Sequence, residues 1–269
     1  MTLARALRAK SGRLSRSDLA SFVQSLPDSK KLLGLTHITS SYLLREIIEA
    51  GSIQAQEPCP VIREPVTYAY YGRAAFRGRE DSKPTNLSFL FPSVLIVDPQ
   101  RVPLPKYVFG FDSGAFVNGI MDPYLHRYMP LFDFLLAPEP RSAARLVAAV
   151  FQTDEDYFRN RPSANFQVPT SNFEAEAYRQ IVLAAGDGRL DDRVSTPELI
   201  FSDPINLRDS VRAAVLPDTL ASDPMIGGAL KAFGVTIYEY PWTNGSRPAE
   251  SHFVVRNLVQ LAYRNLKWL

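Results

Sequence analysis

The sequence predicts an α+β fold, with one domain built around a split, mainly antiparallel sheet flanked by helices. Strand-like segments are scattered among irregular stretches and unevenly spaced helical segments, without the regular strand–helix alternation of a doubly wound sheet. The 21 prolines interrupt many of the intervening stretches. The chain is 46% hydrophobic over 269 residues and shows no repeat or linker. We therefore expect a single domain over residues 1–269.

The first 30 residues are expected to form an N-terminal helical segment. Ser17 can cap a helix over 17–30, whose apolar residues recur at helical spacing. Several arginines and a lysine precede the first acid, Asp18. A solvated helix face is our preferred interpretation of this basic stretch, and an organellar transit peptide is the alternative.

A strand over 33–39 is predicted to lead into a short, well-delimited helix. Ser40 or Ser41 can cap this helix, and Gly51 is placed to end it in a left-handed conformation. Its apolar positions Leu43, Leu44, Ile47 and Ile48 fall on one stripe. A second short strand is expected near Ile53.

The rest of the chain is predicted to alternate strands with proline-rich loops. Residues 57–86 and 112–141 are expected to be mostly irregular. The segment 174–184 is helical or begins extended, and periodicity does not decide between them. The tail over 251–269 is predicted to be an amphipathic helix. Further strands are expected over 87–97, 107–111, 196–200, 211–216 and 235–240, a helix over 143–151, and inward positions at Phe253, Leu258, Leu261 and Leu266 of the tail.

Composition and motif searches exclude several classes of function. A net charge of +2 is too small for a generic polyanion binder. Cys59 is the single cysteine, and none of the three histidines has a second ligand at metal-binding spacing. No glycine-rich dinucleotide or phosphate loop and no apolar run of membrane-spanning length occurs. We expect no metal and no membrane partner, and a cytoplasmic location.

Two polar clusters stand out within apolar surroundings. The first is Thr36-His37-Ile38-Thr39-Ser40. A neutral imidazole between Thr36 and Thr39 can donate to a ribose hydroxyl, although a satisfied core histidine is an equal alternative. The second is Tyr68-Ala69-Tyr70-Tyr71-Gly72-Arg73, where Tyr68 and Tyr70 share a face if the segment is extended.

The tyrosine cluster has a binding interpretation and a packing interpretation. The aromatic faces of Tyr68, Tyr70 and Tyr71 can hold a flat cationic ring such as nicotinamide. Arg73, with Arg77 and Arg79 nearby, can bind a pyrophosphate. Tyrosines beside a glycine also commonly pack a loop onto a core, and a charge run is commonly a solvated face.

A third cluster carries two carboxylates, in Phe173-Glu174-Ala175-Glu176-Ala177-Tyr178. In an extended segment Glu174 and Glu176 would project from the same face and raise each other's proton affinity. A carboxylate can hold a ribose hydroxyl and stabilise an oxocarbenium-like state. The alternative is a helix start, where acids are favoured by the helix dipole.

A His, then a Tyr pair, then a Glu-x-Glu resembles the motif order of NAD-dependent ADP-ribosyltransferases of the His-Tyr-Glu type. The resemblance implies an ADP-ribosyltransferase-like fold, NAD as substrate, a catalytic Glu176 and a target-orienting Glu174. It also implies that His37 anchors NAD, with Tyr70 or Tyr71 stacking on nicotinamide and Arg73 at the phosphates. A His first with a Glu-x-Glu last is a mixed pattern, which leaves open whether the macromolecular acceptor is a protein or a nucleic acid.

By family analogy, such a transferase would serve as a toxin or phage-defence effector with an antitoxin or regulator. Two other functions remain open. One is a non-enzymatic binding module. The other is a dimeric aspartic protease, because Phe111-Asp112-Ser113-Gly114-Ala115 resembles that catalytic turn and Met225-Ile226-Gly227 its later strand. Asp112 would otherwise line the NAD cleft with His37, or Ser113 and Gly114 would form a simple turn.

Overall fold

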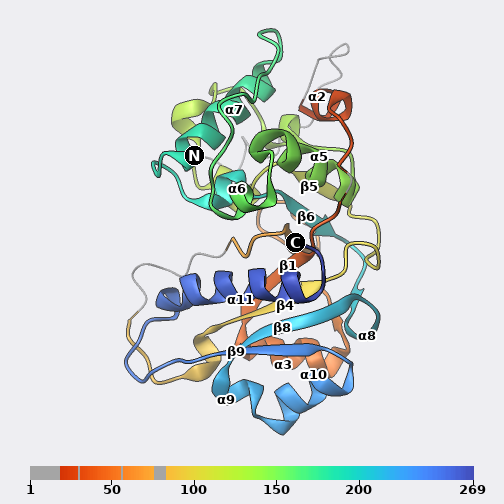
Figure 1. Cartoon of the computed structure of the whole chain (residues 1–269), viewed down its shortest axis with the longest axis vertical. Coiled ribbons are helices and arrows are strands. Elements are labelled where there is room, and N and C mark those ends of the chain that lie inside the picture. Colours follow the sequence, from red (N-terminus) through yellow and green to blue (C-terminus); the bar gives the residue numbers. More distant parts are fainter. Residues whose placement is uncertain (1–18, 30, 56, 76–82) are drawn as a thin grey trace. The chain divides into compact units, whose positions relative to one another are not determined.

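The computed structural model describes residues 19–29, 31–55, 57–75 and 83–269 (Figure 1). The predicted cap at Ser17, the basic start of the chain, Arg77 and Arg79 lie outside these residues. The chain divides into two compact units that interleave along the sequence. Unit 1 comprises Met1–Leu32, Gln56–Tyr71 and Leu104–Ser202, and unit 2 comprises Leu33–Ala55, Gly72–Pro103 and Asp203–Leu269.

Three strands of unit 1 pair in the order β5-β6-β3, and both pairings are antiparallel. They are β3 (Thr67–Tyr71), β5 (Tyr107–Phe109) and β6 (Glu198–Phe201). In the register, Glu198 lies opposite Tyr70 on β3 and opposite Phe109 on β5. Glu198 therefore lies in the middle strand of these three, at the end where β6 begins.

Helices and aromatic side chains form the core of unit 1. Helix α5 packs on β3 and β5, and α2 packs on α5 and α7. Rings of Phe111, Phe116, Phe134 and Tyr178 lie 5.2–6.4 Å apart in a buried group. The helices are α2 (Leu19–Ser25), α4 (Ser113–Val117), α5 (Pro140–Phe151), α6 (Asp154–Phe158) and α7 (Phe173–Gly186), with 3-10 turns η2 (Asp122–Tyr124), η3 (Leu131–Phe134) and η4 (Asp192–Ser195).

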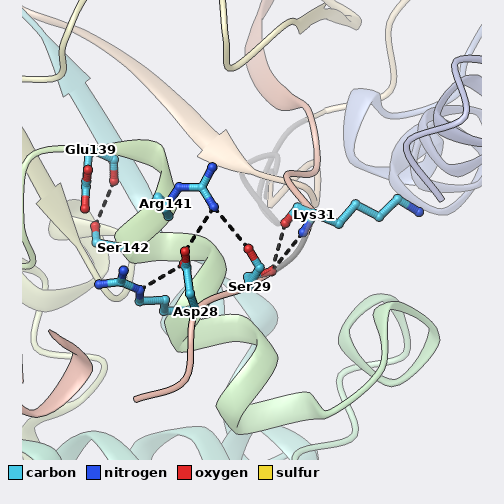
Figure 2. A network of polar contacts seen from close by, with 7 residues as sticks. Asp28, Ser29, Lys31, Glu139, Arg141 and Ser142 are labelled. Atoms are coloured by element: carbon cyan, nitrogen blue, oxygen red, sulfur yellow. Dashed lines mark hydrogen bonds and ion pairs between the residues drawn. The ribbon is translucent and has the colours of Figure 1, made fainter. Parts of the chain in front are cut away.

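A polar network fastens the segment after α2 to the first turns of α5 (Figure 2). Arg145 Nε donates to Asp28 Oδ1 at 3.0 Å, and Arg141 Nη1 donates to Asp28 Oδ2 at 3.3 Å and to the Ser29 carbonyl at 3.1 Å. Desolvation opposes the effect, but the two arginines together lower the pKa of Asp28. Because these groups are exposed, the network positions the segment more than it stabilises the fold.

Unit 2 contains four strands in the order β1-β4-β8-β9. They are β1 (Leu35–Ser40), β4 (Pro92–Val97), β8 (Val211–Pro217) and β9 (Thr236–Tyr240). The β1–β4 and β4–β8 pairings are antiparallel, and β8–β9 is parallel. A separate antiparallel pair joins β2 (Ser52–Ile53) to β7 (Ile205–Asn206).

Helices cover both faces of these four strands, with α11 (His252–Asn265) on one face and α3 (Ser41–Ala50), α9 (Asp218–Ala221) and α10 (Ala229–Ala232) on the other (Figure 1). Ser40 caps α3 by accepting from the Leu43 backbone N–H, and Gly51 ends it with φ +67°. Both caps agree with the sequence prediction. The other short elements are η1 (Ser88–Leu90), α8 (Leu207–Ser210), the π-helical turn η5 (Pro224–Gly228) and η6 (Pro248–Ser251).

The predicted α+β class, with a mainly antiparallel sheet flanked by helices, is confirmed. Several boundaries differ. The apolar run over 87–97 is a strand only over Pro92–Val97. The predicted inward stripe of the last helix is wrong at Phe253 and Leu261, which are 74% and 41% exposed. The buried stripe consists of Val255, Val259, Ala262 and Tyr263, which also follow helical spacing.

Candidate functional site

The candidate site of unit 1 begins with the alternation of side chains along β3. Thr67, Ala69 and Tyr71 are buried, whereas Tyr68 and Tyr70 are half-buried on the opposite face, as the sequence predicted for an extended segment. Tyr70 lies directly opposite Glu198, and paired residues of an antiparallel ladder project from the same face. The pairing therefore places a phenol and a carboxyl side by side.

Asp112 joins these two residues from the loop after β5. Its Oδ2 accepts a hydrogen bond from the Tyr70 hydroxyl at 2.9 Å, and its Oδ1 accepts one from the Ala115 backbone N–H at 2.8 Å. It thereby caps α4, and its own N–H donates to the Arg193 carbonyl at 3.0 Å. Both carboxyl oxygens of Asp112 therefore accept a hydrogen bond, which fixes the orientation of the group.

Glu198 is a carboxyl group with only 3% of its surface exposed. Its Oε2 accepts a hydrogen bond from the backbone N–H of Ser113, the residue next to Asp112. Burial, together with the charge of Asp112, raises the pKa of Glu198 to about 8, although the Ser113 hydrogen bond acts in the opposite direction. Glu198 therefore holds a proton at neutral pH.

Other titratable groups around the pair reflect the same environment. Burial first, and then the charge of Asp112, raise the pKa of Tyr70. Burial and a contact with Cys59 raise the pKa of Tyr68. Arg193 is hydrogen-bonded to Asp191, which raises the pKa of Arg193, and its positive charge also acts on Asp112 and Tyr70. The cluster thus contains two carboxyls, two phenols and one guanidinium.

The predicted carboxylate pair at Glu174 and Glu176 has a different geometry. The segment is helical from Phe173, with the buried Asn172 capping α7 through its bond to the Ala175 N–H at 2.9 Å. Residues two apart on a helix point about 200° apart around its axis. Glu174 is buried, whereas Glu176 accepts from Gln180 Nε2 at 2.8 Å in an exposed pair. The shared face expected of an extended segment is therefore absent.

Tyr71 has a packing role, unlike its neighbours on β3. It is buried against Tyr157, with ring centroids 6.5 Å apart, and the Tyr157 hydroxyl donates to the Tyr71 carbonyl. Of the three predicted tyrosines, only Tyr68 and Tyr70 therefore project from the face that carries Glu198.

The remaining predicted residues belong to unit 2. His37 and Thr39 are half-buried on β1, opposite Leu95 and Ser93 of β4. Thr36 is buried, and its hydroxyl donates to the Arg73 carbonyl at 2.8 Å. The Arg73 side chain is only 1% exposed, so the structure offers no support for an exposed phosphate-binding guanidinium. The roles of these four residues stay predictions.

The protease alternative loses the structural elements that suggested it. Asp112 begins a helical turn where a protease-like strand would continue. Met225, Ile226 and Gly227 lie in the π-helical turn η5 and not in a strand. The turn interpretation of Ser113 and Gly114 is closer to what the structure contains.

Glu198 is the residue that the sequence interpretation missed. The segment 196–200 was predicted to be a strand, and β6 confirms it, but its single acid was not considered. A lone glutamate directly before the apolar run Leu199-Ile200-Phe201 is the available signal, because an acid on a fully buried strand needs partners. Its partners are remote in sequence, so no local spacing could identify them.

Within the described residues, no group of three or more His, Cys, Asp or Glu side chains is arranged to hold a metal ion. Nor does that part of the chain contain a helix of sufficient length and apolarity to cross a membrane. Comparisons of the chain with models of protein families, with curated proteins and with solved structures found no match. The case for a function therefore depends on the geometry and on the motif order.

Proposed function

We propose that this chain transfers ADP-ribose from NAD to a macromolecular acceptor, or hydrolyses NAD at the same site, with Glu198 as the catalytic carboxylate. The observation that carries the proposal is the buried Glu198 beside Tyr70 and next to Asp112. Buried carboxyls with strongly shifted proton affinity gather at functional sites. Glu198 takes the role that the sequence suggested for Glu176.

The order of the residues along the chain also supports this assignment. His37 lies on β1, Tyr68 and Tyr70 on β3 and Glu198 on β6, which keeps the His, Tyr, Glu order of the family that the sequence resembles. His37 would hold a ribose hydroxyl, and Tyr68 and Tyr70 would present aromatic faces to nicotinamide. Thr39, two residues after His37 on β1, would contact the NAD ribose together with His37.

The proposed reaction breaks the bond between ribose C1′ and the nicotinamide nitrogen, and the electron pair leaves with neutral nicotinamide. An acceptor oxygen or nitrogen, or water, then bonds to C1′ and releases one proton to solvent. Positive charge develops on the ribose in the transition state, and an ionised Glu198 would stabilise it. A contact made mainly in the transition state raises the rate without tightening NAD binding.

The wider setting follows only by analogy with the resembled family. We propose a toxin or phage-defence effector that acts in the cytoplasm on a protein or nucleic acid, together with an antitoxin or regulator.

Incubation of the purified chain with NAD labelled in its adenylate part, with and without a cell lysate, tests the proposal. We expect free nicotinamide in both reactions and a labelled macromolecule in the reaction with lysate. Digestion of the product with protease, DNase or RNase then identifies the class of acceptor. Neither nicotinamide nor labelled product from any of these reactions would favour a binding module.

A further inference from the structure

Asp112 is hydrogen-bonded next to Glu198, although the proposed reaction gives Asp112 no role. Its carboxylate does not bridge to a lysine or cap a long helix; it accepts from Tyr70 and from the N–H of Ala115. The next backbone N–H, that of Ser113, donates to Glu198. The backbone N–H groups of Ser113 and Ala115 therefore bind the carboxyl groups of Glu198 and Asp112, respectively, at the start of α4.

The groups that face Asp112 and Glu198 come from two other elements. Tyr68 and Tyr70 project from β3, and Arg193 belongs to η4. Among these groups only Arg193 carries a positive charge that favours ionisation of the pair. That charge is shared with Asp191, to which the Arg193 guanidinium donates two hydrogen bonds. Two buried carboxyls with one partly engaged cation cannot both ionise readily at neutral pH.

We propose that Asp112 is a positioning residue that sets the pH range of the site: the hydrogen bonds from Tyr70 and Ala115 place its carboxyl group beside Glu198, which Ser113 binds, and this neighbour opposes the ionisation of Glu198. The inference rests on the proposed function, because the ionised Glu198 is the form that stabilises the ribosyl cation. NAD cleavage then accelerates as the solution becomes alkaline and the Glu198 proton passes to solvent. The hydrogen bonds from Tyr70 and Ala115 hold the Asp112 carboxyl group in this position.

Asp112→Asn tests this assignment with little change of shape. Asparagine is also a good helix N-cap, so the bond to the Ala115 N–H and the start of α4 are retained. Removal of the charge leaves Glu198 easier to ionise. The acid limb of the pH–rate profile should move to lower pH by about one unit or more, which is about a tenfold faster reaction below the limb.

Asp187→Asn is the matched control, since Asp187 is an exposed acid of unit 1 paired with Arg189. Its pH–rate profile should coincide with that of the unsubstituted chain. If Asp112→Asn also leaves the profile unmoved, or moves the acid limb to higher pH, the assignment is overturned. Tyr70→Phe provides a second variant, because it removes one of the two hydrogen bonds that hold the Asp112 carboxyl group beside Glu198, and it should shift the profile in the same direction as Asp112→Asn.

A measurement without NAD separates this inference from the proposed function. The carboxyl carbon of Glu198, in protein labelled with ¹³C at glutamate side chains, is identified by the NMR signal that Glu198→Gln removes. We expect that signal to titrate far above the ordinary range for glutamate, and at lower pH in Asp112→Asn. Titration of Glu198 in the ordinary range in both proteins would overturn the inference. If the expected titration is observed but no NAD is cleaved, the coupling of the two carboxyl groups is supported and the proposed transferase activity is contradicted.

Discussion

Two pairs of acids in unit 1 show that distance along the chain and distance in the folded structure can differ. Glu174 and Glu176 are two residues apart, yet α7 points them to different sides, one buried and one paired with Gln180. Asp112 and Glu198 are remote in sequence, yet they are held by neighbouring groups of one short segment. Proximity along the chain is therefore a poor guide to coupling between carboxyls; here the coupling comes from a hydrogen bond between a strand and the loop that follows the neighbouring strand.

The largest expected effect is on catalysis. Glu198→Gln removes the charge but keeps the shape, so nicotinamide release should fall by roughly 100- to 1,000-fold, the scale of one lost electrostatic contact in a transition state. NAD affinity should change little. Initial rates and binding isotherms measure both quantities, with Glu155→Gln, an exposed acid paired with Arg159, as the control. An unchanged rate of nicotinamide release in Glu198→Gln would show that Glu198 is no more important for catalysis than the acids of α7.

The second prediction concerns stability and pH. The pKa of Glu198 is raised in the folded chain from 4.5 to about 8, so the folded chain binds more protons at this residue between these values. The contribution to stability is therefore complete below the lower value and is lost as pH rises through the upper one.

Glu198→Gln does not titrate at this position, so its melting temperature relative to the unsubstituted chain should rise between about pH 5 and about pH 8. Melting curves by circular dichroism at a series of pH values measure the difference. The corresponding difference for Glu155→Gln should stay flat. A flat difference for Glu198→Gln as well would mean that Glu198 is not a buried acid of high proton affinity.

A smaller effect is expected in unit 2. His37→Ala should weaken NAD binding by roughly 1–2 kcal/mol, the range for hydrogen bonds of ordinary strength, because one ribose contact is lost. Calorimetric titration with NAD measures the affinity, and a melting curve measures the fold. Unfolding without a separable loss of affinity would make His37 a structural residue of β1.

The smallest predicted effect tests the other acid pair by way of its helix. Asn172→Ala removes the cap bond to the Ala175 N–H and should lower the free energy of unfolding by about 1 kcal/mol. The rate of nicotinamide release per folded molecule should stay the same, because the start of α7 has a structural role. Denaturant unfolding measures the stability, and the nicotinamide assay measures the rate. A large loss of rate would show that the start of α7 contributes to the active site.

Local signals predicted those parts of the fold that depend on local chemistry. The cap at Ser40, the left-handed Gly51 and the alternation at Tyr68 and Tyr70 follow from the residues themselves. The exposed Phe253 shows where such signals fail, since two helical stripes fit the last helix and only packing against β8 and β9 selects one. The sequence did not identify Glu198 for the same reason, because the neighbours of Glu198 come from β3 and from the loop that carries Asp112.

A structure of the chain with a non-cleavable NAD analogue tests the central claim most directly. We predict that the hydroxyls of the nicotinamide ribose lie within hydrogen-bonding distance of Glu198, with the nicotinamide ring beside Tyr70 or Tyr68. An analogue bound at the start of α7, with its ribose on Glu176 and no contact to Glu198, would contradict the account.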